Sequence, residues 1–194
     1  VALAIGAVTL GRAISQASAT CAGLAREQGI PAGLMESILE VNRYRRKKFL
    51  QTILAHFNEE VAGKHFAFWG AAFKPRTDDL RGAPALDLIA ALVDRGATVR
   101  VYDPVAGPKL ASRFSGGVEL ARKVYEALEN ADALVITTEW NEFRRPDYER
   151  MAALMRQRVI FDGRNLFTPA VIARAGFWYY SVGRPPAKPV TNQP

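Results

Sequence analysis

The 194-residue sequence contains only one cysteine and two histidines, and this scarcity excludes several kinds of site. A single cysteine, Cys21, rules out an internal disulfide framework and a Cys-rich zinc site. Cys21 has no nearby histidine or basic group in the sequence that would activate it, so we do not predict that it is a nucleophile. His56 and His65 lack the spacing of metal ligands. We therefore expect no metal site, and a reducing, cytoplasmic compartment fits the cysteine usage best.

Long apolar runs are also missing. The longest, residues 1–10, is too short to span a bilayer, is broken by Gly6 and lacks a charged leading region, so it predicts neither a membrane helix nor a signal peptide. The sequence begins with Val1 rather than methionine, and we expect it to be a fragment. Its 26 Lys and Arg residues against 19 Asp and Glu give a net charge of +7, which favours an anionic partner. A phosphorylated small ligand, a nucleic acid and an acidic surface all remain open on this ground.

A long helix is predicted over residues 31–63. Pro31 stands at a plausible first helical position, and apolar residues follow at helical spacing: Leu34, Ile38, Val41, Phe49, Ile53 and Phe57. At 1.5 Å per residue this helix would be roughly 50 Å long, more than a small domain needs for its own packing. A helix of that length usually bridges two domains or two subunits. Residues 1–30 are small and weakly patterned, and we predict no element for them.

Beyond the helix, strand and helix patterns alternate. The strand candidates are 65–70, 98–102, 133–138, 159–162 and 177–182, and the helix candidates are 84–95, 120–130, 146–155 and 169–175. This order predicts an α/β fold with a doubly wound, mostly parallel, Rossmann-like sheet of about five strands. The expected organisation is an unassigned segment 1–30, a helix 31–63, a ligand-binding domain 64–184 and a proline-rich, disordered tail 185–194.

The segments after the predicted strands are unusually polar. Ligands of open parallel sheets bind beyond the carboxyl ends of the strands. One edge of this sheet would collect cationic side chains around two aromatic ones: Lys74, Arg76, Arg81 and Arg164 around Phe73 and Trp140. Such a cleft suits a nucleotide diphosphate, although each loop taken singly could be only a polar connection. Gly70 is followed by two alanines and not by a G-x-G-x-x-G motif, so side chains and not a glycine-rich backbone are expected to hold the phosphates.

A second basic group lies on the predicted long helix. It comprises Arg43 and residues 45–48. The preferred interpretation is a solvated helix face. Nucleic-acid binding is a weaker alternative, since no aromatic stacking motif accompanies these residues.

Several motifs stand in order along the chain: F-K-P-x-T-D-D-x-R-x-A-P over 73–84, Y-D-P over 102–104, T-E-W-x-E-F over 138–143, F-D-G-R-N over 161–165, then Gly176-Phe177 and Gly183-Arg184. Together with E-V-N over 40–42 and the basic residues after it, this set resembles the C-terminal, UDP-binding domain and central helix of UDP-glucose 6-dehydrogenases. The resemblance covers about residues 31–184.

The resemblance implies substrate, cofactor and partner. Intact members oxidise the sugar C6 alcohol in two hydride transfers to successive NAD molecules through a cysteine thioester. The counterparts of Phe73, Lys74 and Arg164 contact the UDP-sugar, UDP-glucose or a related one. The counterpart of Arg81 reaches toward NAD bound mostly by another domain, and the central helix forms the core of a homodimer. No nucleic acid or membrane is implied.

The first 20 residues depart from the family. The catalytic cysteine of its G-G-S-C-F-P-K-D stretch falls on Ala13 in an ungapped count from Gly29 and Asn42, and Cys21 lies eight positions too late. No residue of this chain is therefore assigned a catalytic role, and the family's NAD domain has no counterpart in it. We expect a domain that binds UDP-sugar and dimerises but does not oxidise its ligand alone. The alternative is a noncatalytic interaction module that pairs with a full-length homologue.

Overall fold

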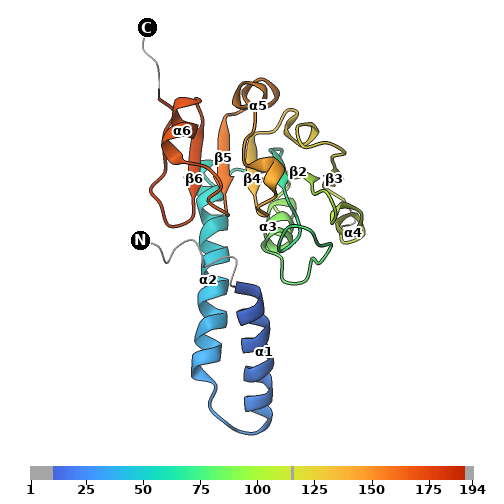
Figure 1. Ribbon diagram of the computed structural model, residues 1–194, viewed down its shortest axis with the longest axis vertical. Helices are drawn as coiled ribbons and strands as arrows, with labels where there is room; N and C mark the ends of the chain where they lie inside the picture. Colours follow the sequence, from blue (N-terminus) through green and yellow to red (C-terminus); the bar gives the residue numbers. More distant parts are fainter. Residues whose placement is uncertain (1–10, 115, 191–194) are drawn as a thin grey trace.

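The fold consists of a sheet covered by helices and a helical hairpin that projects from it (Figure 1). The computed structural model describes residues 11–114 and 116–190. The hairpin consists of α1 (Gly11–Glu27) and α2 (Gly33–His56), and the C-terminal half of α2 continues along the sheet. The long helix therefore belongs to both parts of the molecule.

The sheet has six parallel strands in the order β3-β2-β1-β4-β5-β6. They are β1 (His65–Trp69), β2 (Thr98–Tyr102), β3 (Val118–Leu120), β4 (Ala133–Ile136), β5 (Val159–Asp162) and β6 (Trp178–Ser181). Every residue of β4 and β5 is buried, as expected for central parallel strands with both faces covered. The order reverses between β1 and β4, which confirms the predicted doubly wound, Rossmann-like fold.

Helices cover both faces. The C-terminal part of α2 and α3 (Pro84–Val93) pack on one face around Ile53, Ile89 and Phe161. On the other face the core around Trp69, Phe143 and Tyr179 is covered by α5 (Tyr148–Leu154), α6 (Pro169–Arg174) and two short 3₁₀ helices, η2 (Glu126–Leu128) and η3 (Asn141–Phe143). The short α4 (Gly107–Ala111) lies beside β3.

Two predicted helices differ from those observed. The long helix ends at His56 and not near Gly63, because Asn58 and Glu59 adopt positive φ angles that turn the chain so that Val61 is buried. The helix predicted over 120–130 is wrong: Leu120 ends β3, the sixth strand, and only η2 is helical. The Glu126 carboxylate accepts hydrogen bonds from the backbone N–H groups of residues 122 and 123, which fixes a turn in place of a helix.

The two ends of the chain also differ from expectation. Residues 11–27, for which no element was predicted, form α1, which packs against α2 and buries Ala22. Residues 185–190 were expected to belong to a disordered tail, but Ala187 exchanges two backbone hydrogen bonds with Tyr179 and the Val190 N–H donates to the Ala173 carbonyl. This segment covers the otherwise exposed edge of β6. Its proline content alone predicts disorder and carries no information about this contact. Residues 191–194 lie outside the described part of the chain.

An aromatic cluster joins α2 to the sheet. The His56 ring lies edge-on to Phe161, Trp178 and Tyr180, and its Nδ1 is 2.8 Å from the Tyr180 hydroxyl. Burial lowers the pKa of His56 from its ordinary value of 6.5. Protonation of His56 therefore opposes folding.

We expect His56→Gln to reduce the loss of stability on acidification. A lowered pKa in the folded state means that the unfolded chain binds the proton more tightly, so stability falls as the pH drops below about 6.5. Urea unfolding at pH 7.5 and 5.5 measures this loss. The wild-type protein should lose more free energy of unfolding than the variant between these two pH values. The loss that remains in the variant includes the contribution of His65, because burial also lowers the pKa of His65. Equal losses in the two proteins would contradict the assignment.

Candidate functional site

The carboxyl ends of β1 and β4 meet at the reversal of strand order, and the chain closes this crevice with its own contacts. Gly70 follows β1 with φ of +86°, and a Cβ built on it would lie 2.3 Å from Thr138 Cβ. The Thr137 hydroxyl donates to the Gly70 carbonyl at 2.6 Å, and the Thr138 hydroxyl donates to the Ala72 carbonyl at 2.5 Å. Because both threonines are buried, these bonds fix the β1 turn against the end of β4.

A buried carboxylate supports the same turn from β2. Asp103 follows β2, is 8% exposed, and accepts four backbone hydrogen bonds. Its Oδ2 accepts from Ala71 at 2.8 Å and Ala72 at 3.1 Å, and its Oδ1 accepts from Val105 at 2.9 Å and Ala106 at 2.8 Å. The turns after two neighbouring strands are thus held by one side chain.

The loop beyond this turn, residues 73–81, presents cations to solvent. Lys74, Arg76 and Arg81 are exposed, whereas Phe73 is buried. Asp79 forms two hydrogen bonds of 3.0 Å with the Arg81 guanidinium, and Asp78 forms a 2.7 Å ion pair with Lys109 of α4. Asp79 thus orients a basic side chain of the loop, and Asp78 ties the loop to α4.

Arg164 connects the ends of three strands. Its Nε donates to the Thr137 carbonyl after β4 at 2.7 Å, and its Nη2 donates to the Phe73 carbonyl in the β1 loop at 2.5 Å. The guanidinium carbon lies 5.9 Å from the centroid of the Phe73 ring, while Nη1 has no hydrogen-bond partner among the described residues. Burial lowers the pKa of Arg164, and Glu139 and Asp162 oppose this change. A positive charge is therefore held at the junction of the β1, β4 and β5 ends.

The turn that carries Arg164 depends on Asp162. This fully buried carboxylate accepts from the Arg164 N–H at 2.8 Å, from the Leu166 N–H at 2.7 Å and from the Tyr179 hydroxyl of β6 at 2.8 Å. Burial raises the pKa of Asp162, and these hydrogen bonds oppose the change. The side-chain amide of Asn165 adds a reciprocal pair of 3.0 Å bonds to the Val182 backbone.

The aromatic side of the rim comes from the segment after β4. Phe143 in η3 stacks on Trp69, and the Tyr102 hydroxyl donates to Glu142 at 3.1 Å. Burial and the Glu142 carboxylate raise the pKa of Tyr102 to about 12. Trp140 is half-buried, and its Nε1 has no partner among the described residues.

The structure places Arg164 beside Phe73, since the Arg164 guanidinium donates to the Phe73 carbonyl and lies 5.9 Å from the Phe73 ring centroid. Lys74 follows Phe73 directly in the chain and is exposed. Arg81 lies in the same loop, but its side chain is 73% exposed and is paired with Asp79. Sequence reasoning did not assign Thr137, Thr138 or Asp103 to the site. Their positions directly after buried strands are the signal that could have drawn attention to them.

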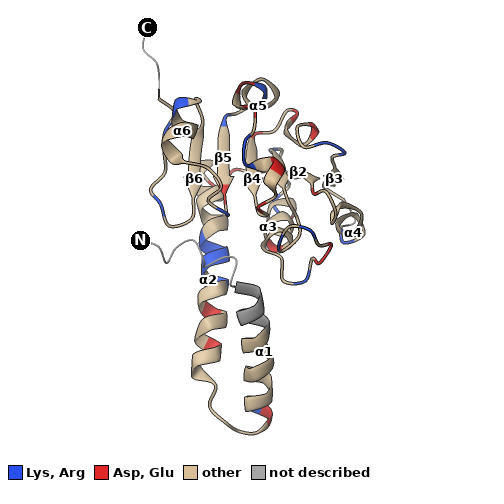
Figure 2. Cartoon of the chain, in the orientation of Figure 1, with Lys and Arg blue, Asp and Glu red and all other residues tan. Residues whose placement is uncertain are grey.

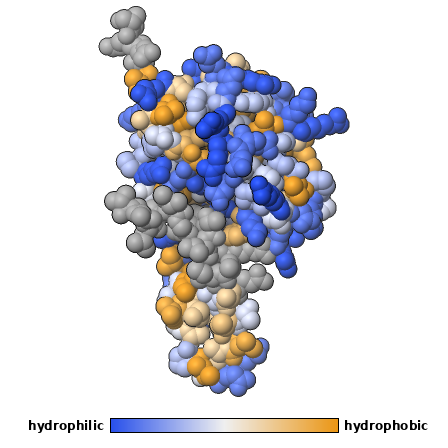
Figure 3. Space-filling view, in the orientation of Figure 1, coloured by the Kyte–Doolittle hydropathy of each residue, from blue (hydrophilic) through white to orange (hydrophobic). Residues whose placement is uncertain are grey.

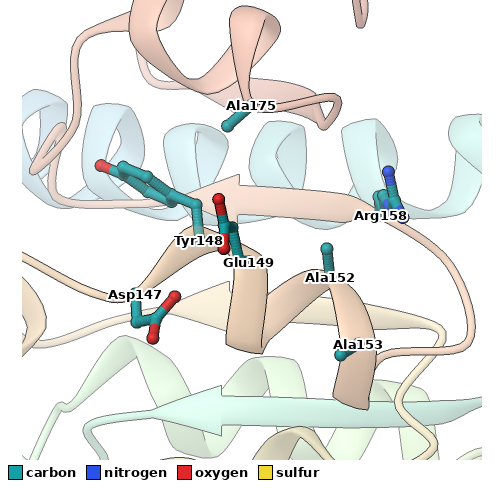
Figure 4. A pocket seen from close by; sticks show the side chains of 7 residues that line it. All are labelled: Asp147, Tyr148, Glu149, Ala152, Ala153, Arg158 and Ala175. Atoms are coloured by element: carbon teal, nitrogen blue, oxygen red, sulfur yellow. The ribbon is translucent and has the colours of Figure 1, made fainter.

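Two surface pockets lie elsewhere. One, of about 620 Å³, runs along α5 and is lined by Asp147, Tyr148, Glu149, Arg158 and three alanines (Figure 4). The other, of about 410 Å³, lies near Tyr102, Tyr125 and Arg150, whose guanidinium is 4.2 Å from the Tyr125 ring centroid. Neither pocket includes Lys74 or Arg164.

No cluster of three or more His, Cys, Asp or Glu side chains able to hold a metal occurs within residues 11–114 and 116–190. In the same part of the chain, no helix combines the length and apolar character needed to cross a membrane. A doubly wound sheet whose carboxyl edge carries cations beside aromatic rings defines a Rossmann-like, nucleotide-binding class of domain.

Comparison with known proteins gives the family. The UDP binding domain of the UDP-glucose/GDP-mannose dehydrogenase family matches residues 67–169, and the chain belongs to this family. It is 41% identical to UDP-glucose 6-dehydrogenase of Pseudomonas aeruginosa over 84% of its own length and 37% of that protein. With UDP-glucose 6-dehydrogenase TuaD of Bacillus subtilis it shares 39% identity, over 84% of its length and 35% of the relative. The chain therefore spans little more than a third of these relatives.

A solved structure extends the comparison to the fold. The UDP-glucose dehydrogenase of the hyperthermophilic archaeon Pyrobaculum islandicum superposes with a TM-score of 0.72 at 25% identity, covering 86% of this chain and 36% of that one. The superposed part includes more than the sheet, since β1 to β6 occupy only residues 65–181. The relation thus covers most of the chain.

We expect Gly70→Ala to destabilise the protein by about 3 kcal/mol, because the new Cβ must displace Thr138 and an L-residue is strained at positive φ. Gly82→Ala is the matched control: its φ is +64° and nothing lies within 4 Å of its Cβ position, so only the backbone cost of about 1 kcal/mol applies. Urea denaturation of both variants measures the difference. Equal losses would show that the Gly70–Thr138 approach is not tight in solution.

Proposed function

We propose that this chain is the nucleotide-sugar-binding part of a UDP-glucose 6-dehydrogenase and that UDP-glucose, or a related UDP-sugar, binds at the rim formed by Phe73, Lys74 and Arg164. The observation that carries the proposal is the Arg164 guanidinium, held by the Thr137 and Phe73 carbonyls beside the Phe73 ring. A cation fixed in this way can face a diphosphate without first becoming ordered. The relatives named as UDP-glucose 6-dehydrogenases support the choice of ligand.

Arg81 is the proposed contact to NAD. Its guanidinium is exposed and has one carboxylate partner, Asp79, in the same loop, which fits a peripheral contact and not a cofactor cradle. NAD would supply the hydride acceptor in the family's reaction. In this proposal the chain's own residues bind and orient the sugar nucleotide.

In this proposal the 194-residue chain does not oxidise its ligand alone. Ala13 stands at the ungapped position of the family's catalytic cysteine, and Cys21 is exposed on α1. The cytoplasm is the proposed compartment, on the basis of the single cysteine. Nucleic acid is not a proposed partner, since no aromatic stacking motif accompanies the basic group of α2. Arg46 of this group is also engaged with Asp87 of α3 at 2.8 Å.

We expect Lys74→Ala to weaken UDP binding about tenfold, since one charge-assisted contact to a phosphate is lost. Lys64→Ala is the control, because Lys64 precedes β1 while Lys74 follows it, so the same charge is removed at the opposite edge of the sheet. Calorimetric titration of UDP and UDP-glucose into the wild-type chain, the two variants and Arg164→Ala provides the comparison. Absence of binding at millimolar UDP, or equal affinities throughout, would refute the rim as the site.

The helical hairpin is the proposed dimer surface. Five of its large apolar residues are strongly exposed: Leu24, Ile30, Leu34, Val41 and Tyr44. Figure 3 shows apolar side chains on the surface of this projecting part, and Figure 2 shows the Lys and Arg residues of α2 where the hairpin meets the sheet domain. Exposed apolar surface on a projecting helix pair favours association with a second copy. The same surface supports the second candidate function, a noncatalytic module that pairs with a full-length homologue.

We expect Leu34→Glu to convert a dimer into a monomer, because Leu34 is 71% exposed in the single chain and a carboxylate there would have to be desolvated at the interface. Val171→Glu on α6, 38% exposed in the unmodified chain, places the same charge far from the hairpin and should leave the mass unchanged. Sedimentation equilibrium reads the mass directly. A monomeric wild-type chain would overturn the homodimer, and mixing that chain with an intact homologue then tests the second candidate.

A further inference from the structure

Four backbone N–H groups converge on one point at the carboxyl edge of the sheet. Two belong to the turn after β1, at Ala71 and Ala72, and two to the turn after β2, at Val105 and Ala106. All four donate to the Asp103 carboxylate over 2.8 to 3.1 Å. A cluster of converging N–H groups is a binding site for a negative charge, and here the chain supplies the charge itself.

These four N–H groups lie where a dinucleotide-binding sheet would bind phosphate. In sheets that bind dinucleotides, the turn after the first strand receives the pyrophosphate on its backbone N–H groups, and an acidic residue at the end of the second strand binds a ribose hydroxyl. Asp103 directly follows β2, so it occupies the place of that acidic residue. Its carboxylate, however, turns back into the β1 turn, where the phosphate would lie.

Space at this point is also closed. Thr138 packs so tightly against Gly70 that one added carbon would lie 2.3 Å from its Cβ, and its hydroxyl donates to the Ala72 carbonyl. A dinucleotide could reach the four N–H groups only by displacing a buried carboxylate and by opening the threonine contacts. Lys74 and Arg164 lie outside this closed turn.

We propose that Asp103 is a specificity-determining residue, an internal anion that fills the phosphate position of this dinucleotide-type sheet. It keeps phosphate groups out of the strand-order reversal and leaves the diphosphate of a sugar nucleotide to Lys74 and Arg164, which lie outside the closed turn. The second statement rests on the proposed function. The first concerns only the chain's own anion site and stands independently.

Replacement of the carboxylate by a free anion tests the first statement. Asp103→Ala removes the COO⁻ group and retains Cβ, and formate has the size and charge of the group that is lost. We expect about 0.2 M sodium formate to raise the melting temperature of Asp103→Ala by about 3 °C or more relative to equal sodium chloride. The wild-type chain and Asp78→Ala, which loses an exposed, ion-paired carboxylate, should show no such difference. Equal formate effects in all three proteins overturn the proposal.

If Asp103→Ala does not fold in chloride, recovery of the folded chain from urea is measured with formate and with chloride. A larger folded yield in formate supports the proposal, and equal yields overturn it.

Amide NMR of the wild-type chain tests, without any substitution, whether phosphate groups are excluded from the four N–H groups. Saturating inorganic phosphate, NAD or UDP should not shift the amide signals of the four donors, Ala71, Ala72, Val105 and Ala106. If these four signals shift more than the amide signals of Lys74 and Arg164, the exclusion is overturned.

The internal anion site and the proposed UDP-sugar site are tested independently. If UDP shifts no amide signal at all, the proposed function fails, while a formate effect confined to Asp103→Ala still supports the internal anion. If UDP shifts Lys74 and Arg164 but formate has no selective effect, the proposed function stands and the role of Asp103 is withdrawn.

Discussion

The close approach of the β1 turn to the end of β4 is the constraint on which the candidate site depends. Gly70 can lie against Thr138 because it has no Cβ and adopts a positive φ. The hydroxyls of Thr137 and Thr138 then satisfy two carbonyls that would otherwise be buried without partners. The Phe73 carbonyl is thereby placed where it accepts a hydrogen bond from the Arg164 guanidinium and so orients it.

The site uses buried carboxylates to fix backbone and exposed cations to present charge. Asp103 and Asp162 each accept at least two hydrogen bonds from backbone N–H groups of the turn that follows them, so each turn is held from within. Lys74 and Arg81 extend from the β1 loop into solvent. Rigid turns that hold the Arg164 guanidinium in place provide a surface that binds an anion at low ordering cost, provided that the anion stays outside the turns.

Much of the fold followed from local pattern. The five predicted strands and the helices beginning near Pro84 and Pro169 were correct because apolar runs, proline starts and glycine stops report on burial and chain direction nearby. The third strand was missed because Leu120 pairs at the edge of the sheet through three residues only, a contact that no periodicity encodes. The early end of α2 was missed for the same kind of reason, since burial of Val61 under the sheet stops the helix.

By itself the sequence determined which polar residues follow the strands, and parallel strands must bring those residues to one edge. That is why Phe73, Lys74 and Arg164 could be predicted from the sequence to lie at the same edge of the sheet. Only the tertiary structure decided how each side chain is used. Asp103 turns inward to the β1 loop, and two nitrogens of Arg164 are engaged by carbonyls from other strands. These choices depend on contacts between residues 27 to 91 positions apart, where angstrom-scale packing and not local propensity sets the geometry.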